Sequence, residues 1–299
     1  MRSIVFVSDF FVEHYHGGAE LTMQAIIDAC PSGHEVIKIQ SHLLTPELVN
    51  KYDSSYWILV NFSGCSQESL IEIVVQELNY SIIECDYKYC KYRSSHLHFL
   101  KENKQCDCQE QRHPGLFVRG LMRRAHKVFF MSQGHLDEYL RVFGPKFGNI
   151  NNFVVQVSTW SQEHLDLLEK LSKTPKNGKW AVLGGASWIK NQSFCEDKLK
   201  SNSVPYDVIG GLPYEQFLEK LSQYKGLCFH PLGFDTCPRI VIEARLMGLE
   251  LDLGELVQHT KDTWWTEAQS PEQLSAWLRF RPQSFWTTLG DIERRTYIE

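Results

Sequence analysis

The sequence lacks several features that define large classes of protein. No apolar run approaches the ~20 residues of a membrane-spanning helix, and the start of the chain shows no signal-peptide pattern. There is no low-complexity segment and no short-period repeat. The nine cysteines are an odd number scattered along a chain without an export signal, so we expect free thiols or a metal site rather than a disulfide framework. We therefore expect a protein without a transmembrane segment that acts in a cytoplasm.

Length and composition indicate an ordinary globular protein of two domains. The chain has 299 residues, of which 43% are hydrophobic and 22% are charged, enough for a substantial core. Short apolar runs alternate with segments of helical periodicity, which predicts a mostly parallel sheet covered on both faces in each domain. The expected strands are residues 4–7, 35–39, 56–61, 81–84, 128–131, 153–157, 180–183, 206–211, 226–230 and 250–253.

A polar segment containing proline and glycine, residues 173–178, is the predicted linker between the two domains. The predicted domains are therefore residues 1–175 and 176–299. A tryptophan-rich helical tail, residues 271–288, is expected to pack back onto the body of the protein. Two successive α/β halves of similar size suggest a ligand cleft between them.

An adjacent glycine pair, Gly17 and Gly18, follows the first expected strand and precedes a helical segment. Strand, glycine pair and helix are the opening of a doubly wound α/β domain, in which glycines let the backbone approach a ligand. The pair is not the G-x-G-x-x-G dinucleotide fingerprint, because no third glycine follows it. A plain tight turn is the alternative interpretation.

The most informative stretch covers residues 233–244. Pro238 predicts that a helix begins there, and a helix start offers N–H groups and a partial positive charge to a phosphate or carboxylate. Asp235 lies before this point and Glu243 inside the helix. Such a pair of acids can hold both the charge and the hydroxyls of a nucleotide sugar. A capped core helix with one stray acid is the alternative.

Together these features resemble nucleotide-sugar-dependent glycosyltransferases of the GT-B fold, closest to glycosyltransferase family 4. The family's glycine pair is matched by Gly17 and Gly18, and its lysine after the first strand of the C-terminal domain by Lys190. Its two acids separated by seven residues are matched by Asp235 and Glu243. The resemblance covers nearly the whole chain. It implies two Rossmann-like α/β domains facing a central cleft, with the donor bound by the C-terminal domain.

The chain departs from the family pattern at three positions. The first acid is Asp235 rather than glutamate, so its side chain is one methylene shorter. Gly185 stands where the family often has an arginine five residues before the lysine, and Asn191 stands where a glycine usually follows the lysine. Arg239, in the first turn of the expected helix, is placed to supply the missing charge.

The resemblance implies a role for each matched residue. Glu243 binds the ribose hydroxyls of the nucleotide and Asp235 the hydroxyls of the donor sugar, while Lys190 and nearby backbone N–H groups stabilise the diphosphate leaving group. A UDP- or GDP-sugar is the expected donor, whose hexosyl or pentosyl group is transferred with retention and without a catalytic metal. The implied catalytic residues are Asp86, Lys190 and Asp235, and the implied donor-binding residues are Gly17, Gly18, Lys190, Asp235, Thr236, Cys237, Pro238, Arg239 and Glu243.

A polar residue after the fourth strand of the first domain commonly lies near the acceptor in such enzymes. Asp86 occupies that region and is the candidate for positioning or deprotonating the acceptor hydroxyl. Glu84 and His16 are alternatives for the same role, and a structural loop cap is a further interpretation. No protein nucleophile is assigned.

The charge of the chain is unevenly distributed. Residues 87–127 contain ten Lys and Arg against three Asp and Glu, so this segment has a net charge of +7. Because the whole chain has a net charge of −5, the remaining residues carry −12. A solvated basic face is one interpretation, and docking of an anionic acceptor is the other. The acceptors considered are a glycan, a lipid-linked precursor or a hydroxylated base in DNA, the last as in some phage enzymes of this fold that act in an infected host cell.

The same basic insert contains a group of potential zinc ligands, Cys90, Cys106, Cys108 and His113. Three thiolates and one imidazole form a familiar structural zinc set. The one-residue gap between Cys106 and Cys108 is tighter than in a standard zinc knuckle, and the alternative ligands are His96, His98 and Cys85. A structural zinc ion would hold the long polar insert over the acceptor side; a group of reduced thiols is the alternative.

Two further functional hypotheses compete with a glycosyltransferase. The departures at Asp235 and Gly185 are compatible with a protein of the same fold that binds a nucleotide or glycan with weak or no turnover. An epimerase acting on the same donors is the other. Donor hydrolysis and the variant Glu243→Ala distinguish them from a transferase.

Overall fold

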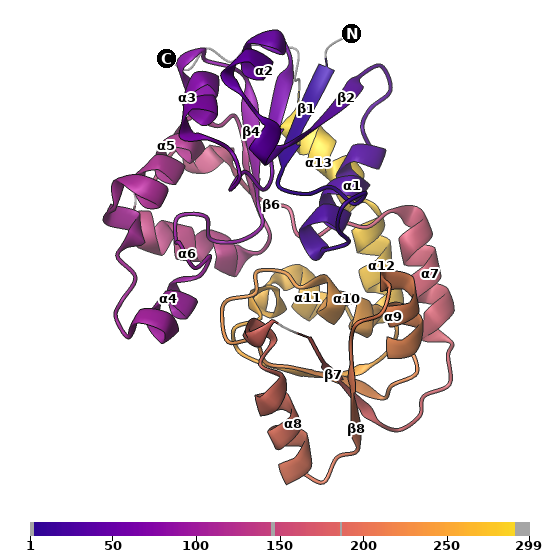
Figure 1. The fold of residues 1–299 in the computed structure, drawn as a ribbon. Helices are drawn as coiled ribbons and strands as arrows, with labels where there is room; N and C mark the ends of the chain where they lie inside the picture. Colours follow the sequence, from indigo (N-terminus) through magenta and orange to yellow (C-terminus); the bar gives the residue numbers. More distant parts are fainter. Residues whose placement is uncertain (1–2, 145–146, 186, 291–299) are drawn as a thin grey trace. The chain divides into compact units, whose positions relative to one another are not determined.

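The computed structural model describes residues 3–144, 147–185 and 187–290, and the chain forms two compact units (Figure 1). Unit 1 comprises Met1–Thr159 and Arg281–Glu299, and unit 2 comprises Trp160–Phe280. Each unit is built around a parallel β-sheet with helices between successive strands. Both sheets thus have the alternating architecture that the sequence predicts.

Unit 1 has a six-stranded parallel sheet with the order β2-β1-β3-β4-β5-β6. Residues 4–7 of β1 are completely buried, because helices cover both faces of such a sheet and its strands become continuous apolar runs. Phe6 is in register with Lys38 of β2 on one side and Ile58 of β3 on the other. The strands are β1 Ser3–Ser8, β2 Glu35–Gln40, β3 Tyr56–Leu59, β4 Tyr80–Glu84, β5 Val128–Phe130 and β6 Phe153–Val155.

Helices α2, α3, α4 and α6 of unit 1 begin at a serine or threonine whose side chain caps the helix. Ser132, for example, accepts a hydrogen bond from the backbone N–H of His135 (3.2 Å), which satisfies one of the N–H groups left open at the start of α6. The helices are α1 Gly18–Asp28, α2 Pro46–Lys51, α3 Gln67–Val75, α4 Ser95–Glu102, α5 Phe117–Arg124, α6 Gln133–Phe143 and α13 Arg281–Leu289. The short turns are η1 Ser41–Leu43, η2 Cys108–Glu110, η3 Arg112–Leu116 and η4 Ile150–Asn152.

Unit 2 has a four-stranded parallel sheet with the order β10-β9-β7-β8. Its strands are β7 Trp180–Leu183, β8 Tyr206–Ile209, β9 Gly226–Phe229 and β10 Glu250–Leu253. Its helices are α7 Gln162–Ser172, α8 Gln192–Ser201, α9 Tyr214–Leu221, α10 Arg239–Leu246, α11 Thr263–Glu267 and α12 Pro271–Arg279, with turns η5 Trp188–Lys190 and η6 Gln258–Lys261. Helices α7, α10 and α12 contact one another, and Figure 1 shows them grouped on one side of the sheet.

The strand order reverses direction once in each sheet, and each reversal determines where the candidate ligand-binding loops lie. In unit 2 the chain leaves β7 toward β8 and later returns to the other side of β7 as β9. In unit 1 the same reversal lies between β1 and β3. The loops that follow the two strands at such a point diverge and leave a crevice at the carboxyl edge, where doubly wound sheets bind ligands.

The chain passes between the units at two neighbouring places. In unit 1, Nε2 of Gln156 donates to the carbonyl of Arg281 (2.9 Å), and the Arg281 guanidinium donates to the carbonyl of Gln156 (3.1 Å). In unit 2, Gln162 donates to the carbonyl of Arg279 (2.9 Å), and Arg279 also contacts Asp166 (2.6 Å). Both ends of unit 2 are therefore fastened together, as are the two segments of unit 1.

These units divide the chain at places that differ from the expected 175/176 boundary. Helix α7 belongs to unit 2 because it contacts α9, α10 and α12 of that unit. Its residues Leu165 and Leu168 are buried. The expected tail of residues 271–288 is two helices in different units. Trp277 of α12 stacks on Trp264 in unit 2 (ring centres 4.9 Å apart), whereas Trp286 of α13 donates to the carbonyl of Ile26 in unit 1 (2.9 Å).

A helix that spans a membrane needs about 20 mostly apolar residues. Across residues 3–144, 147–185 and 187–290, no helix is long and apolar enough to cross a membrane.

Candidate functional site

The stretch around Asp235 forms a rigid loop at the carboxyl end of β9. The backbone N–H of Asp235 donates to the carbonyl of Leu256 (2.9 Å), and its own carbonyl accepts from Gln258 (3.0 Å). Asp235 also forms an isolated parallel bridge with Val257. Because both backbone groups are held, the direction of the Asp235 side chain is fixed by the fold.

Lys190 lies in the loop after β7, directly beside this stretch. Its Nζ is 3.6 Å from Oδ2 of Asp235, and both side chains remain partly exposed. Two hydrogen bonds join the loops: Leu232 N–H donates to the carbonyl of Ile189 (2.9 Å), and Asn191 Nδ2 donates to the carbonyl of His230 (3.0 Å). The structure thus brings together two of the predicted residues, at the reversal of strand order in unit 2.

The departures at Asn191 and Gly185 have a backbone explanation. Asn191 adopts a left-handed conformation (φ +55°), which asparagine tolerates better than most residues and which a glycine would adopt freely. Gly185 has φ +152°, and a Cβ built there would meet no atom within 4 Å. An arginine at 185 would have space but would be strained by this backbone conformation.

Glu243 is almost completely buried in α10, surrounded by polar groups from three helices. Its Oε1 accepts hydrogen bonds from the indole N–H of Trp160 (3.1 Å) and from the Tyr214 hydroxyl, and lies 3.3 Å from Nε of Arg239. Nε2 of His164 is 3.1 Å from the Tyr214 hydroxyl. Burial lowers the pKa of His164 to about 4, so this imidazole is neutral near pH 7.

The segment between the two acids is mostly buried. Thr236 and Cys237 have little exposed surface, and Pro238 is the capping residue before α10 rather than its first helical residue. The guanidinium of Arg239 stacks over the Trp160 ring, 4.3 Å from its centre, beside Glu243. Its charge is therefore engaged inside unit 2, which differs from the expectation that Arg239 replaces the missing arginine at the diphosphate.

In unit 1 the glycine pair begins α1, as expected from the sequence. Gly17 is the capping residue and Gly18 the first helical residue. A Cβ on Gly17 would collide with the Glu20 carboxylate and the Tyr15 ring, so a larger residue here would displace these side chains. Glu20 is buried, which raises its pKa. His16 is exposed in the preceding loop.

Glu84 and Asp86 differ sharply in their surroundings at the end of β4. Glu84 is fully buried; its Oε1 accepts from the Tyr139 hydroxyl (2.9 Å) and the Lys88 backbone N–H (3.0 Å). Nζ of Lys88 lies 3.2 Å from Glu84 Oε2 and 3.4 Å from Asp86 Oδ1. Burial raises the pKa of Glu84 to about 7, although Lys88 opposes this change. Glu84 is thus shielded from any acceptor in this structure.

Asp86 is partly exposed and held as a carboxylate. Its Oδ1 accepts a hydrogen bond from Nη1 of Arg93 (2.8 Å). Burial would raise the pKa of Asp86, but the positive charges of Lys88 and Arg93 outweigh it and hold that pKa below its usual range. The Asp86 backbone carbonyl accepts from Nε2 of His135 (2.9 Å), whose pKa burial lowers to about 3. Such a carboxylate is a weak base but a strong hydrogen-bond acceptor.

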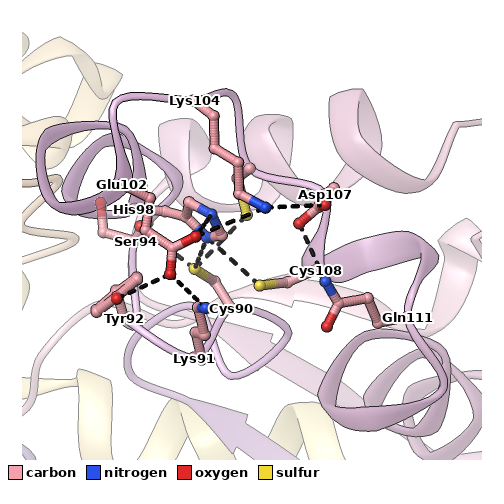
Figure 2. Close-up of polar contacts among 11 residues, drawn as sticks. Cys90, Lys91, Tyr92, Ser94, His98, Glu102, Lys104, Asp107, Cys108 and Gln111 are labelled. Atoms are coloured by element: carbon pink, nitrogen blue, oxygen red, sulfur yellow. Dashed lines mark hydrogen bonds and ion pairs between the residues drawn. The ribbon is translucent and has the colours of Figure 1, made fainter.

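The basic insert gathers three thiols and one imidazole at one point (Figure 2). The side-chain ligand atoms of Cys90, His98, Cys106 and Cys108 all lie within 4.8 Å of one another. His98 is on the buried side of α4, whereas His113 is exposed with its ring beside Phe117. The group therefore contains His98, one of the alternatives, in place of His113.

Comparisons with known proteins identify the fold. No protein-family model and no curated protein sequence match the chain. Similar solved structures include HepE of Anabaena in complex with UDP and glucose, at 12% identity and a TM-score of 0.61, covering 98% of this chain and 100% of that one. Sucrose-phosphate synthase of Thermosynechococcus elongatus follows at 11% identity and 0.58, covering 97% and 94%. UDP-N-acetylglucosamine 2-epimerase of Rickettsia bellii is similar at 7% and 0.51, covering 97% and 96%.

The chain has the GT-B fold. This confirms the expected class, two Rossmann-like α/β domains. Because all of these identities are below 25%, the likeness extends to the GT-B fold alone and leaves the activity to be argued from the residues.

Three side chains around Glu243 could not have been found from sequence. Trp160 lies just before α7, His164 lies in α7 and Tyr214 in α9, and no motif links them to Glu243. Lys88 was missed as well, because the residues between Glu84 and Lys88 are not helical and a spacing of four residues predicts a contact only in a helix.

Proposed function

We propose that this protein is a glycosyltransferase that transfers a sugar from a nucleotide-sugar donor to an acceptor hydroxyl. The observation that carries the proposal is the pairing of Lys190 with Asp235 (3.6 Å) at the strand-order reversal of unit 2, with Glu243 in the helix that follows. Both loops leave the carboxyl edge of the sheet, where this class of fold binds nucleotides. The residues match the pattern of glycosyltransferase family 4, which supports a retaining transfer.

The chemistry of each group fits a donor that leaves as a nucleoside diphosphate. The partly exposed Lys190 ammonium would stabilise the negative charge that develops on the diphosphate, and backbone N–H groups of residues 236–237 would add to it. Asp235 would accept hydrogen bonds from sugar hydroxyls. Glu243, in the helix that follows, would bind the ribose hydroxyls, as the family resemblance implies. A UDP-sugar is the first donor to test, with GDP-sugars as the alternative.

The acceptor role is proposed for Asp86 of unit 1. Its carboxylate is ionised and partly exposed, and Arg93 fixes its direction. Because the pKa of Asp86 is below its usual range, we assign it the positioning of the acceptor hydroxyl rather than full removal of the proton. Gly17 and Gly18 would let the backbone approach the ligand. A glycan, a lipid-linked precursor and a hydroxylated DNA base are the acceptor classes to compare.

The surroundings of Glu243 favour one other function, binding of a nucleotide sugar without turnover. Oε1 of Glu243 is already bound by Trp160, Tyr214 and Arg239, and Asp235 is one methylene shorter than the family's acid. An epimerase of the same fold would convert the donor without any acceptor. The nine free thiols support a reducing compartment such as a cytoplasm for any of these activities.

The deciding experiment is a panel of UDP- and GDP-sugars assayed with the purified full chain. Release of the nucleoside diphosphate and binding by calorimetry are measured for wild type, Glu243→Gln and Glu250→Gln. Glu250 is the matched control because it is an exposed glutamate at the amino end of β10, whereas the candidate donor site lies at the carboxyl ends of the strands of the same sheet. We expect Glu243→Gln to weaken nucleotide binding by about 10- to 100-fold, the value of hydrogen bonds to a charged group, and Glu250→Gln to leave it unchanged.

Each outcome of the panel separates the hypotheses. Release that increases with an acceptor supports a transferase. Binding without release supports the binding protein, and a new sugar nucleotide without release supports an epimerase. If no donor binds or is hydrolysed by wild type, the proposal fails.

A further inference from the structure

The Cys/His cluster, defined as Cys90, His98, Cys106 and Cys108, has the geometry of a metal site. We infer that the cluster binds one structural zinc ion. Its side chains come from a turn after β4, from the buried side of α4 and from the segment that leads into η2. The cluster is independent of the donor residues, so this inference does not depend on the proposed function.

The distances between the ligand atoms match those around a tetrahedral zinc ion. With Zn–S of about 2.3 Å and Zn–N of about 2.0–2.1 Å, tetrahedral ligands lie about 3.8 Å apart for two sulfurs and about 3.6 Å apart for sulfur and nitrogen. In the cluster, Sγ of Cys106 and Cys90 are 3.6 Å apart. Nδ1 of His98 is 3.4 Å from Sγ of Cys108 and 3.7 Å from Sγ of Cys90. Three thiols and one imidazole form a closed set that zinc favours over harder cations.

The second nitrogen of the histidine has a carboxylate close by, the kind of partner that a zinc-bound imidazole uses. Nε2 of His98 lies 3.4 Å from Oε2 of Glu102, one helical turn further along α4. Glu102 is itself held by the Tyr92 hydroxyl (2.9 Å) and by the ammonium of Lys91. On zinc binding, a hydrogen bond from Nε2–H to this carboxylate would fix the tautomer that leaves a lone pair on Nδ1, the atom that faces the thiols in Figure 2.

The charge balance of the insert also fits. Zinc with three thiolates and a neutral imidazole carries a net charge of −1, and residues 87–127 carry +7. Lys91 contacts Glu102, and Lys104 lies 3.6 Å from Glu102 and 3.4 Å from Asp107, all close to the cluster in Figure 2. The insert therefore supplies the positive charge that a thiolate-rich site attracts.

A second group of potential ligands in the described residues lacks these properties. Cys228, His230 and Asp252 also approach one another in unit 2. There the Lys198 ammonium lies 2.6 Å from Asp252 and 3.1 Å from Nε2 of His230. Because the lysine ammonium already contacts two of the three residues in that group, we assign zinc to the Cys/His cluster alone.

Zinc would fix the fold of the insert. The cluster residues span positions 90–108. This segment consists of helix α4 with turns on either side of it. Joining the two ends of this segment through a metal limits its unfolded conformations and holds the adjacent turn. That turn contains Lys88 and Arg93, both of which contact Asp86.

The test is metal analysis of the untagged full chain and of matched variants. We expect about one zinc per chain in wild type and in His113→Ala, and about a tenfold lower content in His98→Ala and Cys108→Ser, because only the latter two remove ligands of the tetrahedral set. His113 is the control because it is an exposed histidine of the same insert. Cobalt added to chelated and refolded wild type should give the visible absorption of tetrahedral thiolate coordination, which keeps the test valid if a variant does not fold.

Several results would overturn the inference. Folded wild type with a zinc content near zero and no cobalt absorption would remove the site. A disulfide between Cys90 and Cys106 in freshly purified protein, shown by mass spectrometry without reduction, would replace it with a covalent bond. Loss of zinc in His113→Ala with retention in His98→Ala would remove His98 from the ligand set.

Discussion

Each unit of the molecule places a buried glutamate and a more exposed aspartate near the carboxyl edge of its sheet. Glu84 and Glu243 are both buried, and each accepts a hydrogen bond from a tyrosine hydroxyl. The side chains of Asp86 and Asp235 keep 37% and 24% of their surface exposed. In both units, therefore, the glutamate side chain is buried and the aspartate side chain is partly exposed to solvent.

The cations of the two units are arranged differently. In unit 1, Lys88 contacts both acids, with Nζ 3.2 Å from Glu84 and 3.4 Å from Asp86. In unit 2 each acid has its own cation, Lys190 for Asp235 and Arg239 for Glu243. A shared cation couples the ionisation of its two acids, whereas separate cations leave them independent. Unit 1 should therefore respond to single substitutions as a network and unit 2 as two separate pairs.

The largest expected effect is the loss of stability when the shared cation is removed. Lys88→Met should lower the free energy of unfolding by about 3–5 kcal/mol, because it leaves the buried carboxylate of Glu84 without its ion-pair partner. Lys190→Met, the matched change in unit 2, should cost about 1 kcal/mol or less, since this ion pair is exposed. Urea unfolding measures both. Equal costs for the two variants would contradict the comparison, and Lys88→Met/Glu84→Gln should recover part of the loss.

A smaller effect should separate the exposed aspartates by function. Under the proposed function, Asp86→Asn should lower kcat about 100-fold, or about 2.7 kcal/mol, with unchanged donor binding, because the acceptor loses its positioning group. Asp235→Asn should instead weaken binding of the nucleotide sugar while leaving binding of the free nucleotide unchanged. Steady-state kinetics and calorimetry with both ligands distinguish these patterns. If Asp86→Asn weakens donor binding instead, Asp86 contacts the donor and its assignment to the acceptor is wrong.

The smallest effect concerns the dependence of stability on pH. Because the pKa of Glu84 is raised from 4.5 to about 7, the folded chain binds more protons at Glu84 than the unfolded chain between these values. The contribution of Glu84 to stability therefore falls as pH rises from about 4.5 to 7, by an amount on the order of a kcal/mol. The neighbours that act on Glu84 are Lys88, Asp86 and Arg93.

Unfolding free energies of wild type and Glu84→Gln at several pH values isolate this contribution. Glutamine does not titrate, so the difference between the two proteins should change across this range and be constant above it. The buried His135 and His164 have lowered pKa values and destabilise both proteins equally as pH falls, so they cancel in the difference. A difference that stays constant from pH 4.5 to 7 would show that Glu84 has an ordinary pKa.

Much of the fold was predictable because parallel strands are short apolar runs. In the described residues, a strand lies at each of the ten expected places. The division into units was less predictable. The polar linker at 173–178 is a local signal, whereas membership of a unit depends on which core a helix packs against, as for α7 and α13.

The candidate site shows the same limit. Lys190 and Asp235 were identified from sequence through the family resemblance, and the strand order of unit 2 places their loops side by side. Spacing along the chain could not distinguish His98 from His113, because the choice depends on which face of α4 turns toward the thiols. The environment of Glu243 depends on Trp160 and Tyr214, contacts across long stretches of sequence that no local pattern records.

The two neighbouring crossing points of the chain make unit 2 an insertion within unit 1. Gln156 and Arg281 are joined by hydrogen bonds on one side of the crossing, and Gln162 and Arg279 on the other. Residues 160–280 are one continuous segment whose two ends lie close together, and unit 1 is completed by the segments on either side of it. The chain is therefore organised as a host unit, which carries Asp86 and the Cys/His cluster, and an inserted unit, which carries Lys190, Asp235 and Glu243.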